Sequence, residues 1–126
     1  MINLKDFMPL EEIEALKIVI RNSPHPKNHL QTIERIKKQI ASCPRMRETE
    51  NQDNPIAVLH YFGGSYDAYI TERGENGEAF GWASFGYGFE CGYINILELI
   101  KYGISLDLYH TPEPIKNLIK EARECM

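Results

Sequence analysis

The chain has 126 residues, of which 43% are hydrophobic and 25% are charged, with a formal net charge of −4. This length fits one domain, and the composition is typical of a soluble globular protein. No apolar run approaches the roughly 20 residues that a membrane span needs, and the N-terminus lacks the pattern of a signal peptide. The three cysteines form no CxxC pair, which indicates reduced thiols rather than a disulfide framework. We therefore expect a cytoplasmic protein with no contact to membranes.

The charges are unevenly distributed along the chain. Residues 1–47 carry nine Lys or Arg and five Asp or Glu, a net charge of +4. Residues 48–126 carry five Lys or Arg and thirteen Asp or Glu, a net charge of −8, so the two parts sum to −4. A basic arm on an acidic body is one way to contact nucleic acid. Lysine-rich helix surfaces that serve only solubility are the other interpretation.

Two amphipathic helices are expected in the N-terminal third. Residues 9–22 begin with a proline and two glutamates, which suit the first turn of a helix, and apolar residues follow at helical spacing. A segment rich in proline ends this helix, and residues 28–42 carry a second apolar stripe. Together they predict a helical hairpin over residues 1–43. The side chains expected to face inward are Ile13, Ile20, Ile33 and Ile40.

Strands are expected in the middle of the chain. The polar stretch 44–54 has the composition of a linker or exposed loop, and residues 55–62 have that of a buried strand. Asn76-Gly77 is the dipeptide of a two-residue type I′ hairpin turn, in which both residues need a positive φ. The strand after this turn should bury Trp82 in an aromatic cluster with Tyr66 or Phe80.

Two further helices are expected near the C-terminus. Asn95 and Glu98 form a capping-box pattern, and Gly103 suits the residue after the helix. A short extended segment, 104–109, precedes a last helix that opens at Thr111-Pro112. The fold class is therefore α+β: an N-terminal helical hairpin, a central antiparallel sheet of about four strands and two C-terminal helices. Residues 55–126 form the α+β domain, with the hairpin packed on it.

The segment FGYGFECGY, residues 85–93, contains four aromatic residues and three glycines. Its glycines miss the GxGxxG spacing of a dinucleotide-binding loop. The aromatic side chains share one parity, as on a base-stacking sheet, but residues 74–100 contain no Lys or Arg, and such platforms need cations for the phosphates. We therefore expect an aromatic row that faces the core of the sheet.

Three segments within residues 56–119 carry a resemblance to a family: AYITERGENGEAFGWASFG, ECGYINILELIKYG and LDLYHTPEPI. Their order and spacing resemble a domain-of-unknown-function family encoded on bacterial plasmids, conjugative elements and phages. The corresponding positions are Tyr69, Asn76-Gly77, Phe80-Gly81, Gly86–Gly88, Glu90–Tyr93, Leu97–Leu99, Asp107–Tyr109, Pro112 and Pro114. The resemblance implies no activity. It implies a mobile genetic element as the setting, and a turn at Gly86–Gly88.

No residue pattern is specific for a catalytic or metal site. His25 and His29 are spaced i, i+4 but lack the HExxH pattern, and His60 has the surroundings of a histidine in a sheet. Cys91 with His60 or His110 could supply a nucleophile and a base, although a buried cysteine is more often inert. The sequence therefore favours a protein without enzymatic activity, metal or cofactor.

The expected function is that of a small non-enzymatic protein-binding accessory protein of a mobile genetic element, with an anti-defence or regulatory role. Its partner is expected to be a protein of the host or of the element. The candidate binding residues are Tyr87, Glu90, Tyr93, Tyr109 and His110. The alternative is a nucleic-acid-associated protein that uses its basic helical hairpin. The candidate phosphate-binding residues are Lys27, Arg35, Lys37 and Lys38.

Overall fold

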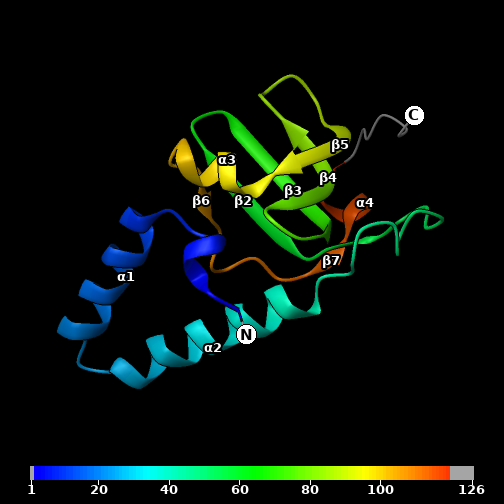
Figure 1. Ribbon diagram of the computed structural model, residues 1–126. Helices are drawn as coiled ribbons and strands as arrows, with labels where there is room; N and C mark the ends of the chain where they lie inside the picture. The colour runs from blue at the N-terminus through cyan, green and yellow to red at the C-terminus, as the bar shows by residue number, and fades with distance from the viewer. Residues whose placement is uncertain (1, 120–126) are drawn as a thin grey trace.

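The computed structural model describes residues 2–119 and shows an α+β fold around an antiparallel sheet (Figure 1). The sheet has five strands rather than the expected four, in the order β5-β4-β3-β2-β6, and a separate two-stranded sheet pairs β1 with β7. The strands are β1 (Ile56–Ala57), β2 (Leu59–Gly63), β3 (Tyr66–Arg73), β4 (Glu78–Ser84), β5 (Glu90–Asn95), β6 (Ser105–Leu106) and β7 (Glu113–Pro114). The helices are the 3-10 helix η1 (Leu4–Asp6) and the α-helices α1 (Leu10–Asn22), α2 (Pro26–Ser42), α3 (Ile96–Lys101) and α4 (Ile115–Leu118).

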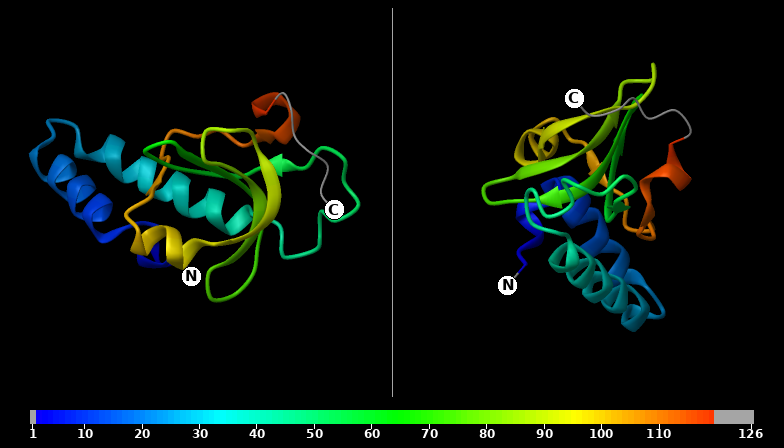
Figure 2. Two further views of the ribbon diagram at one scale, coloured as in Figure 1. Left: turned by 90° about the horizontal axis from the view of Figure 1, so that it is seen from above. Right: turned by 90° about the vertical axis from the view of Figure 1, so that its right-hand side faces the viewer.

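The helices α1 and α2 form the expected hairpin. It lies against one face of the sheet, and its tip projects beyond the sheet (Figure 2). Of the four isoleucines expected to face inward, Ile13 and Ile40 are buried, whereas Ile20 and Ile33 are only half-buried. The reason is that the half-buried residues lie nearer the projecting tip, where no strand covers them.

Hydrogen bonds from side chains hold the C-terminal half of α2 on the sheet. The amide nitrogen Nε2 of Gln39 donates to the carbonyl oxygens of Val58, at 2.7 Å, and His110, at 3.1 Å. Nε of Arg73 in β3 donates to the carbonyl oxygen of Ile40 at 2.9 Å. These contacts sit beside the main hydrophobic core, so they fix the position of α2 where apolar packing alone has no directional preference.

The polar segment 44–54 is tied to the sheet by one buried carboxylate. Glu72 is 4% exposed and accepts hydrogen bonds from the backbone amides of Arg47, at 2.7 Å, and Thr49, at 2.9 Å. The hydroxyl of Thr49 donates to it as well. A bulge in β3 between Ile70 and Glu72 interrupts the strand register here. The charge of Glu72 is thus satisfied by the loop that it organises.

The turn between β3 and β4 and the helix cap before α3 are both confirmed. Asn76 and Gly77 have φ values of 57° and 81°, and the amide of Glu78 donates to the carbonyl of Glu75 at 3.1 Å across the turn. Before α3, the side chain of Asn95 accepts a hydrogen bond from the amide of Glu98 at 3.2 Å. Both features depend on residues that are neighbours in the chain.

The expectation of a core-facing aromatic row in residues 85–93 is wrong except at Phe89, which is half-buried and packs against a buried cluster that includes Trp82. Phe85, Tyr87 and Tyr93 are 70%, 97% and 79% exposed. Gly86 and Gly88 have φ values of 103° and 115°, a backbone conformation that breaks a strand. The alternation of side chains therefore does not continue from β4 into β5, and the turn implied by the family resemblance is present at these glycines.

The C-terminal part differs from its expectation in length. The strand expected at 55–62 is interrupted at Val58. The last helix does not open at Thr111-Pro112 as expected: residues 113–114 form β7, and α4 begins at Ile115 and is a single turn. The part of the expected helix beyond Ile119 lies outside the described residues. Ile115 and Ile119 pack with Ala57 and Trp82 in a second small core on the sheet face away from α2.

The expectation for Trp82 is confirmed, whereas the expectation of reduced cysteines is confirmed only in part. Trp82 is 9% exposed and meets Phe80 edge-on at 6.2 Å between ring centroids, as expected. Cys43 is a free, buried thiol, and burial, as the largest cause, raises its pKa to about 12. Cys91 is disulfide-bonded, so the expectation of reduced cysteines is wrong at this position.

Candidate functional site

Two histidines and two aspartates meet on the sheet face that α2 does not cover. We call His60, Asp67, Asp107 and His110 the polar cluster. His60 lies in β2 and Asp67 in β3, while Asp107 and His110 belong to the turn that follows β6. Side chains alternate between the faces of a strand. Leu59 and Tyr61, which flank His60 in the sequence, are in the main core. The imidazole therefore points to the opposite face.

The ring of His60 is held between the two carboxylates. Its Nδ1 lies 2.9 Å from Oδ2 of Asp107, and its Nε2 lies 2.8 Å from Oδ1 of Asp67. Ionised carboxylates only accept hydrogen bonds, so a ring nitrogen that carries a proton is the donor in its contact with a carboxylate. The ring also stacks on Tyr69, with centroids 4.6 Å apart and an angle of 17° between the planes.

Asp107 is fixed on both of its oxygens. Oδ1 accepts a hydrogen bond from the backbone amide of Tyr109 at 2.9 Å, and Oδ2 faces His60. Burial favours the neutral carboxyl, but the hydrogen bonds from His60 and Tyr109 outweigh it and hold the pKa of Asp107 below its usual value. This carboxylate is therefore ionised at neutral pH.

His110 is the most buried member of the cluster, at 7% exposure. Its Nε2 lies 2.8 Å from the carbonyl oxygen of Ala57, and a carbonyl only accepts, so this nitrogen carries the proton. Its ring centroid is 5.9 Å from those of His60 and Tyr69. No local signal in the sequence brings the two histidines together, because they lie 50 positions apart in the chain.

The candidate protein-binding residues do not form one site. Tyr87 lies in the turn between β4 and β5, and Glu90 begins β5 and is exposed. Tyr93 is opposite Phe80, toward the other end of these strands. Tyr109 is 85% exposed beside the polar cluster, whereas the side chain of His110 is directed inward to Ala57.

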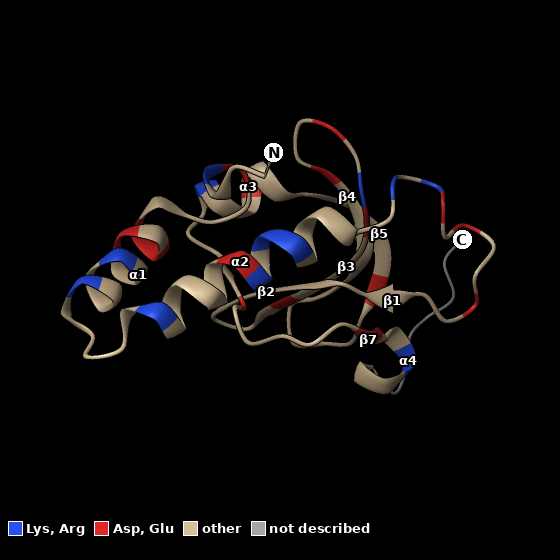
Figure 3. Ribbon diagram, turned by 90° about the horizontal axis from the view of Figure 1, so that it is seen from below, with Lys and Arg blue, Asp and Glu red and all other residues tan. Residues whose placement is uncertain are grey.

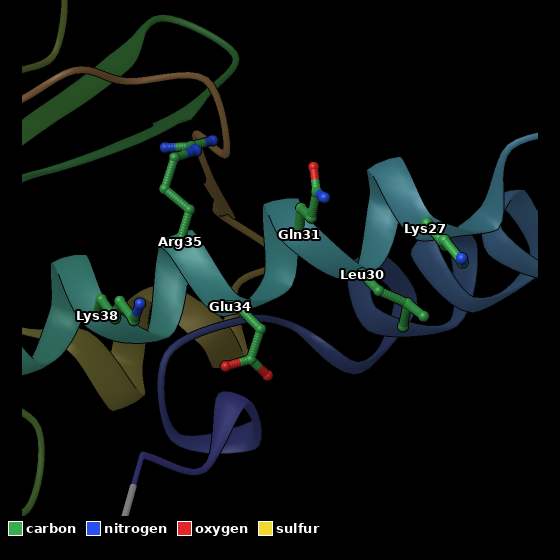
Figure 4. A pocket seen from close by; sticks show the side chains of 6 residues that line it. All are labelled: Lys27, Leu30, Gln31, Glu34, Arg35 and Lys38. Atoms are coloured by element: carbon green, nitrogen blue, oxygen red, sulfur yellow. The ribbon is translucent and has the colours of Figure 1, made fainter.

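The candidate phosphate-binding residues lie on α2, where Figure 3 shows several basic segments close to an acidic one. A hollow of about 580 Å³ runs along this helix (Figure 4). Its lining residues are Lys27, Leu30, Gln31, Glu34, Arg35 and Lys38. Arg35 donates to the carbonyl oxygen of Leu108 and to Oε1 of Gln39, so its charge is partly engaged within the fold. Lys37 is half-buried and does not line the hollow.

The suggested pairing of Cys91 with a histidine is not formed by His60. Cys91 lies in β5 and His60 in β2, and the strands β4 and β3 separate them. Three strand spacings of about 4.8 Å place the two backbones roughly 14 Å apart. A nucleophile and its base need hydrogen-bond contact, which this distance prevents.

Comparison with other proteins gives no further indication of function. No protein-family model matches the chain, and neither a curated protein nor a solved structure matches it significantly. The family resemblance of residues 56–119 therefore stays a prediction. Within the described residues, no helix is both long and apolar enough to cross a membrane.

Proposed function

We propose that the protein is a protein-binding accessory protein of a bacterial mobile genetic element, with an anti-defence or regulatory role. The observation that carries the binding function is the turn between β4 and β5. We call Phe85, Gly86, Tyr87 and Gly88 the aromatic turn. It presents two aromatic side chains to solvent, one of them 97% exposed. The connection between β4 and β5 lies at one end of the sheet (Figure 1).

The composition of the aromatic turn is that of a recognition loop. Tyrosine supplies a large, amphipathic contact area at low conformational-entropy cost, and glycine and serine supply an adaptable backbone, as in antibody loops. Function is often carried by loops positioned on a rigid scaffold. Exposure of two large aromatic rings has no benefit for the folded monomer, whereas burying them against a partner stabilises a complex.

The aromatic turn is partly preorganised. The hydroxyl oxygen of Ser84 accepts a hydrogen bond from the amide of Gly86 at 3.0 Å, and the ring of Phe85 lies 5.0 Å from that of Tyr66. Such ordering lowers the entropy lost on binding. The part of the chain that carries the turn, residues 48–126, has a net charge of −8. A protein with an apolar and basic surface is therefore the partner that it suits.

The test is capture of a partner by the full-length protein from a bacterial host, followed by titration of the purified partner. The variant Phe85→Ser with Tyr87→Ser should bind at least tenfold more weakly, since truncated interface aromatics often cost 2 kcal/mol or more. The matched control is Tyr102→Ser, because Tyr102 is also largely exposed but lies at the end of α3. Equal weakening by the control, or full binding by the double variant, would contradict the proposal.

Nucleic-acid binding is the second candidate, because three of the four candidate cations line the hollow on α2. Its variant is Lys27→Glu with Lys38→Glu, since both side chains are exposed and line the hollow. If these lysines bind phosphates, the variant should reduce the salt dependence of DNA or RNA binding by about two counterions. No binding by the wild-type protein at low salt would exclude this candidate.

The cytoplasm remains the proposed location. The free, buried thiol of Cys43 suits a reducing compartment, whereas the disulfide at Cys91 is a feature that oxidising compartments favour. Fractionation of cells that express the protein, with the redox state of Cys91 measured in the same samples, tests this directly. Recovery in an extracytoplasmic fraction would contradict the location.

A further inference from the structure

We propose that the polar cluster binds a divalent metal ion of the zinc type through His60, Asp107 and His110. One potential ligand atom from each of the three lies within 4.8 Å of the others. Two imidazoles and a carboxylate form a donor set that zinc uses in proteins, with a fourth position open to water. The site is independent of the aromatic turn, so each proposal stands or fails alone.

The two histidines are already oriented as metal ligands are. Nε2 of His60 contacts the carboxylate of Asp67, and Nε2 of His110 donates to the carbonyl of Ala57, both at 2.8 Å. A metal-ligating histidine commonly uses its second ring nitrogen in this way, which fixes the tautomer and the direction of the ring. Nδ1 of each ring is then the nitrogen that coordinates the ion, with Asp67 and Ala57 as outer partners.

Small movements bring the ligand atoms to coordination distance. Bonds of about 2.0–2.1 Å in a tetrahedron place ligand atoms roughly 3.3 Å apart. Nδ1 of His60 and Oδ2 of Asp107 are now 2.9 Å apart and share a proton, so the ion takes the place of that proton. The side chain of Asp107 is 26% exposed and lies in a turn, which gives the carboxylate room to adjust and the ion a path from solvent.

The charge of the cluster favours a cation. The carboxylates of Asp67 and Asp107 lie 2.8 Å and 2.9 Å from the ring nitrogens of His60, and both ion pairs that the structure shows for these aspartates come from His60 itself. A divalent ion bound by the two imidazoles and Asp107 would offset the negative charge of these two carboxylates.

The test uses the full-length protein after removal of metals with a chelator. Zinc is titrated by calorimetry, and cobalt by its visible absorbance. The expected result is one ion per chain, with a four-coordinate cobalt spectrum that lacks the intense thiolate band. Asp107→Asn and His110→Gln should each weaken zinc binding more than 100-fold. Asp67→Asn should weaken it 10- to 100-fold, because it removes an outer partner only.

The matched control removes the other two histidines, which lie at the start of α2. The variant His25→Ala with His29→Ala should bind zinc as the wild type does. Failure of the wild type to take up one ion, or unchanged affinity in Asp107→Asn, would overturn the proposal and leave the polar cluster as a hydrogen-bonded link between strands.

A readout on the unmodified protein covers the case in which a variant does not fold. In the NMR spectrum of the imidazole groups, added zinc should shift the signals of His60 and His110 at one equivalent. Shifts confined to His25 and His29 would refute the site.

Discussion

Replacing Gln39 with leucine should destabilise the fold more than the small change in side-chain volume suggests. Gln39 is 7% exposed, and its Nε2 donates to the carbonyl oxygens of Val58 and His110. Leucine fills a similar space but donates to neither. Each buried carbonyl that loses its donor costs about 1–3 kcal/mol, so the two together should lower the free energy of unfolding by roughly 2–4 kcal/mol. That is a large share of the stability of a typical domain, about 5–15 kcal/mol.

Urea unfolding monitored by circular dichroism measures this loss, and a thermal melt should show a fall of about 4 °C per kcal/mol for a chain of this size. The matched control is Gln31→Leu, because Gln31 lies on the same helix with its side chain exposed. Its effect should stay within about 0.5 kcal/mol. A second variant, Gln39→Glu, keeps the shape of the side chain but places a carboxylate oxygen against the two carbonyl oxygens. It should be at least as unstable as Gln39→Leu. Equal stability of the Gln39→Leu and Gln31→Leu proteins would refute the role of these hydrogen bonds.

Three further predictions concern backbone contacts and one buried carboxyl. Gly81→Ala should lower the free energy of unfolding by more than about 2 kcal/mol, because its Cβ would lie 1.8 Å from the carbonyl oxygen of Tyr69. The control is Gly92→Ala, since Gly92 pairs with Gly81 on the neighbouring strand and its Cβ would meet nothing within 4 Å. The same denaturant assay should show no loss of stability for this control. Gly77→Val should cost more than about 1 kcal/mol, since φ is 81° there and a Cβ would lie 2.6 Å from a leucine side chain of α3; a melting temperature equal to that of wild type would count against the turn. Burial, the largest cause, raises the pKa of Glu12 from 4.5 to about 7, so the folded state holds this proton more tightly and stability falls as the pH rises from about 4.5 to 7. Glu12→Gln should remove about 1 kcal/mol of that fall, a value reduced for partial exposure, and parallel stability curves between pH 4.5 and 8 would contradict it.

The elements that the sequence predicted correctly depend on neighbouring residues. The Asn76-Gly77 turn follows from two residues that tolerate positive φ, and the start of α3 follows from a cap that spans three residues. The two N-terminal helices follow from the 3.6-residue period of their apolar side chains. In each case the decisive interaction joins residues that are only a few positions apart in the sequence.

The exposure of the aromatic turn could not be predicted in this way. The sequence shows glycines beside aromatic residues, but the same letters suit a continuous strand or a turn. The outcome depends on where β4 stops pairing with β5, which is set by the register of the whole sheet. A continuous strand would bury Phe85 and Tyr87, whereas the turn exposes them.

The polar cluster depends entirely on the tertiary structure. His60 and Asp107 are 47 positions apart, and they meet because β6 pairs with the edge of β2 that faces away from β3. Asp107 then reaches His60 from the side of β6, and Asp67 reaches it from the side of β3. The sequence predicted a buried strand that contains His60 between the apolar residues Leu59 and Tyr61, and the two-residue period of a strand directs the side chain of His60 away from theirs. Only strand pairing decided which carboxylates meet it, because charges attract at any separation but a hydrogen bond needs its two atoms within about 3 Å.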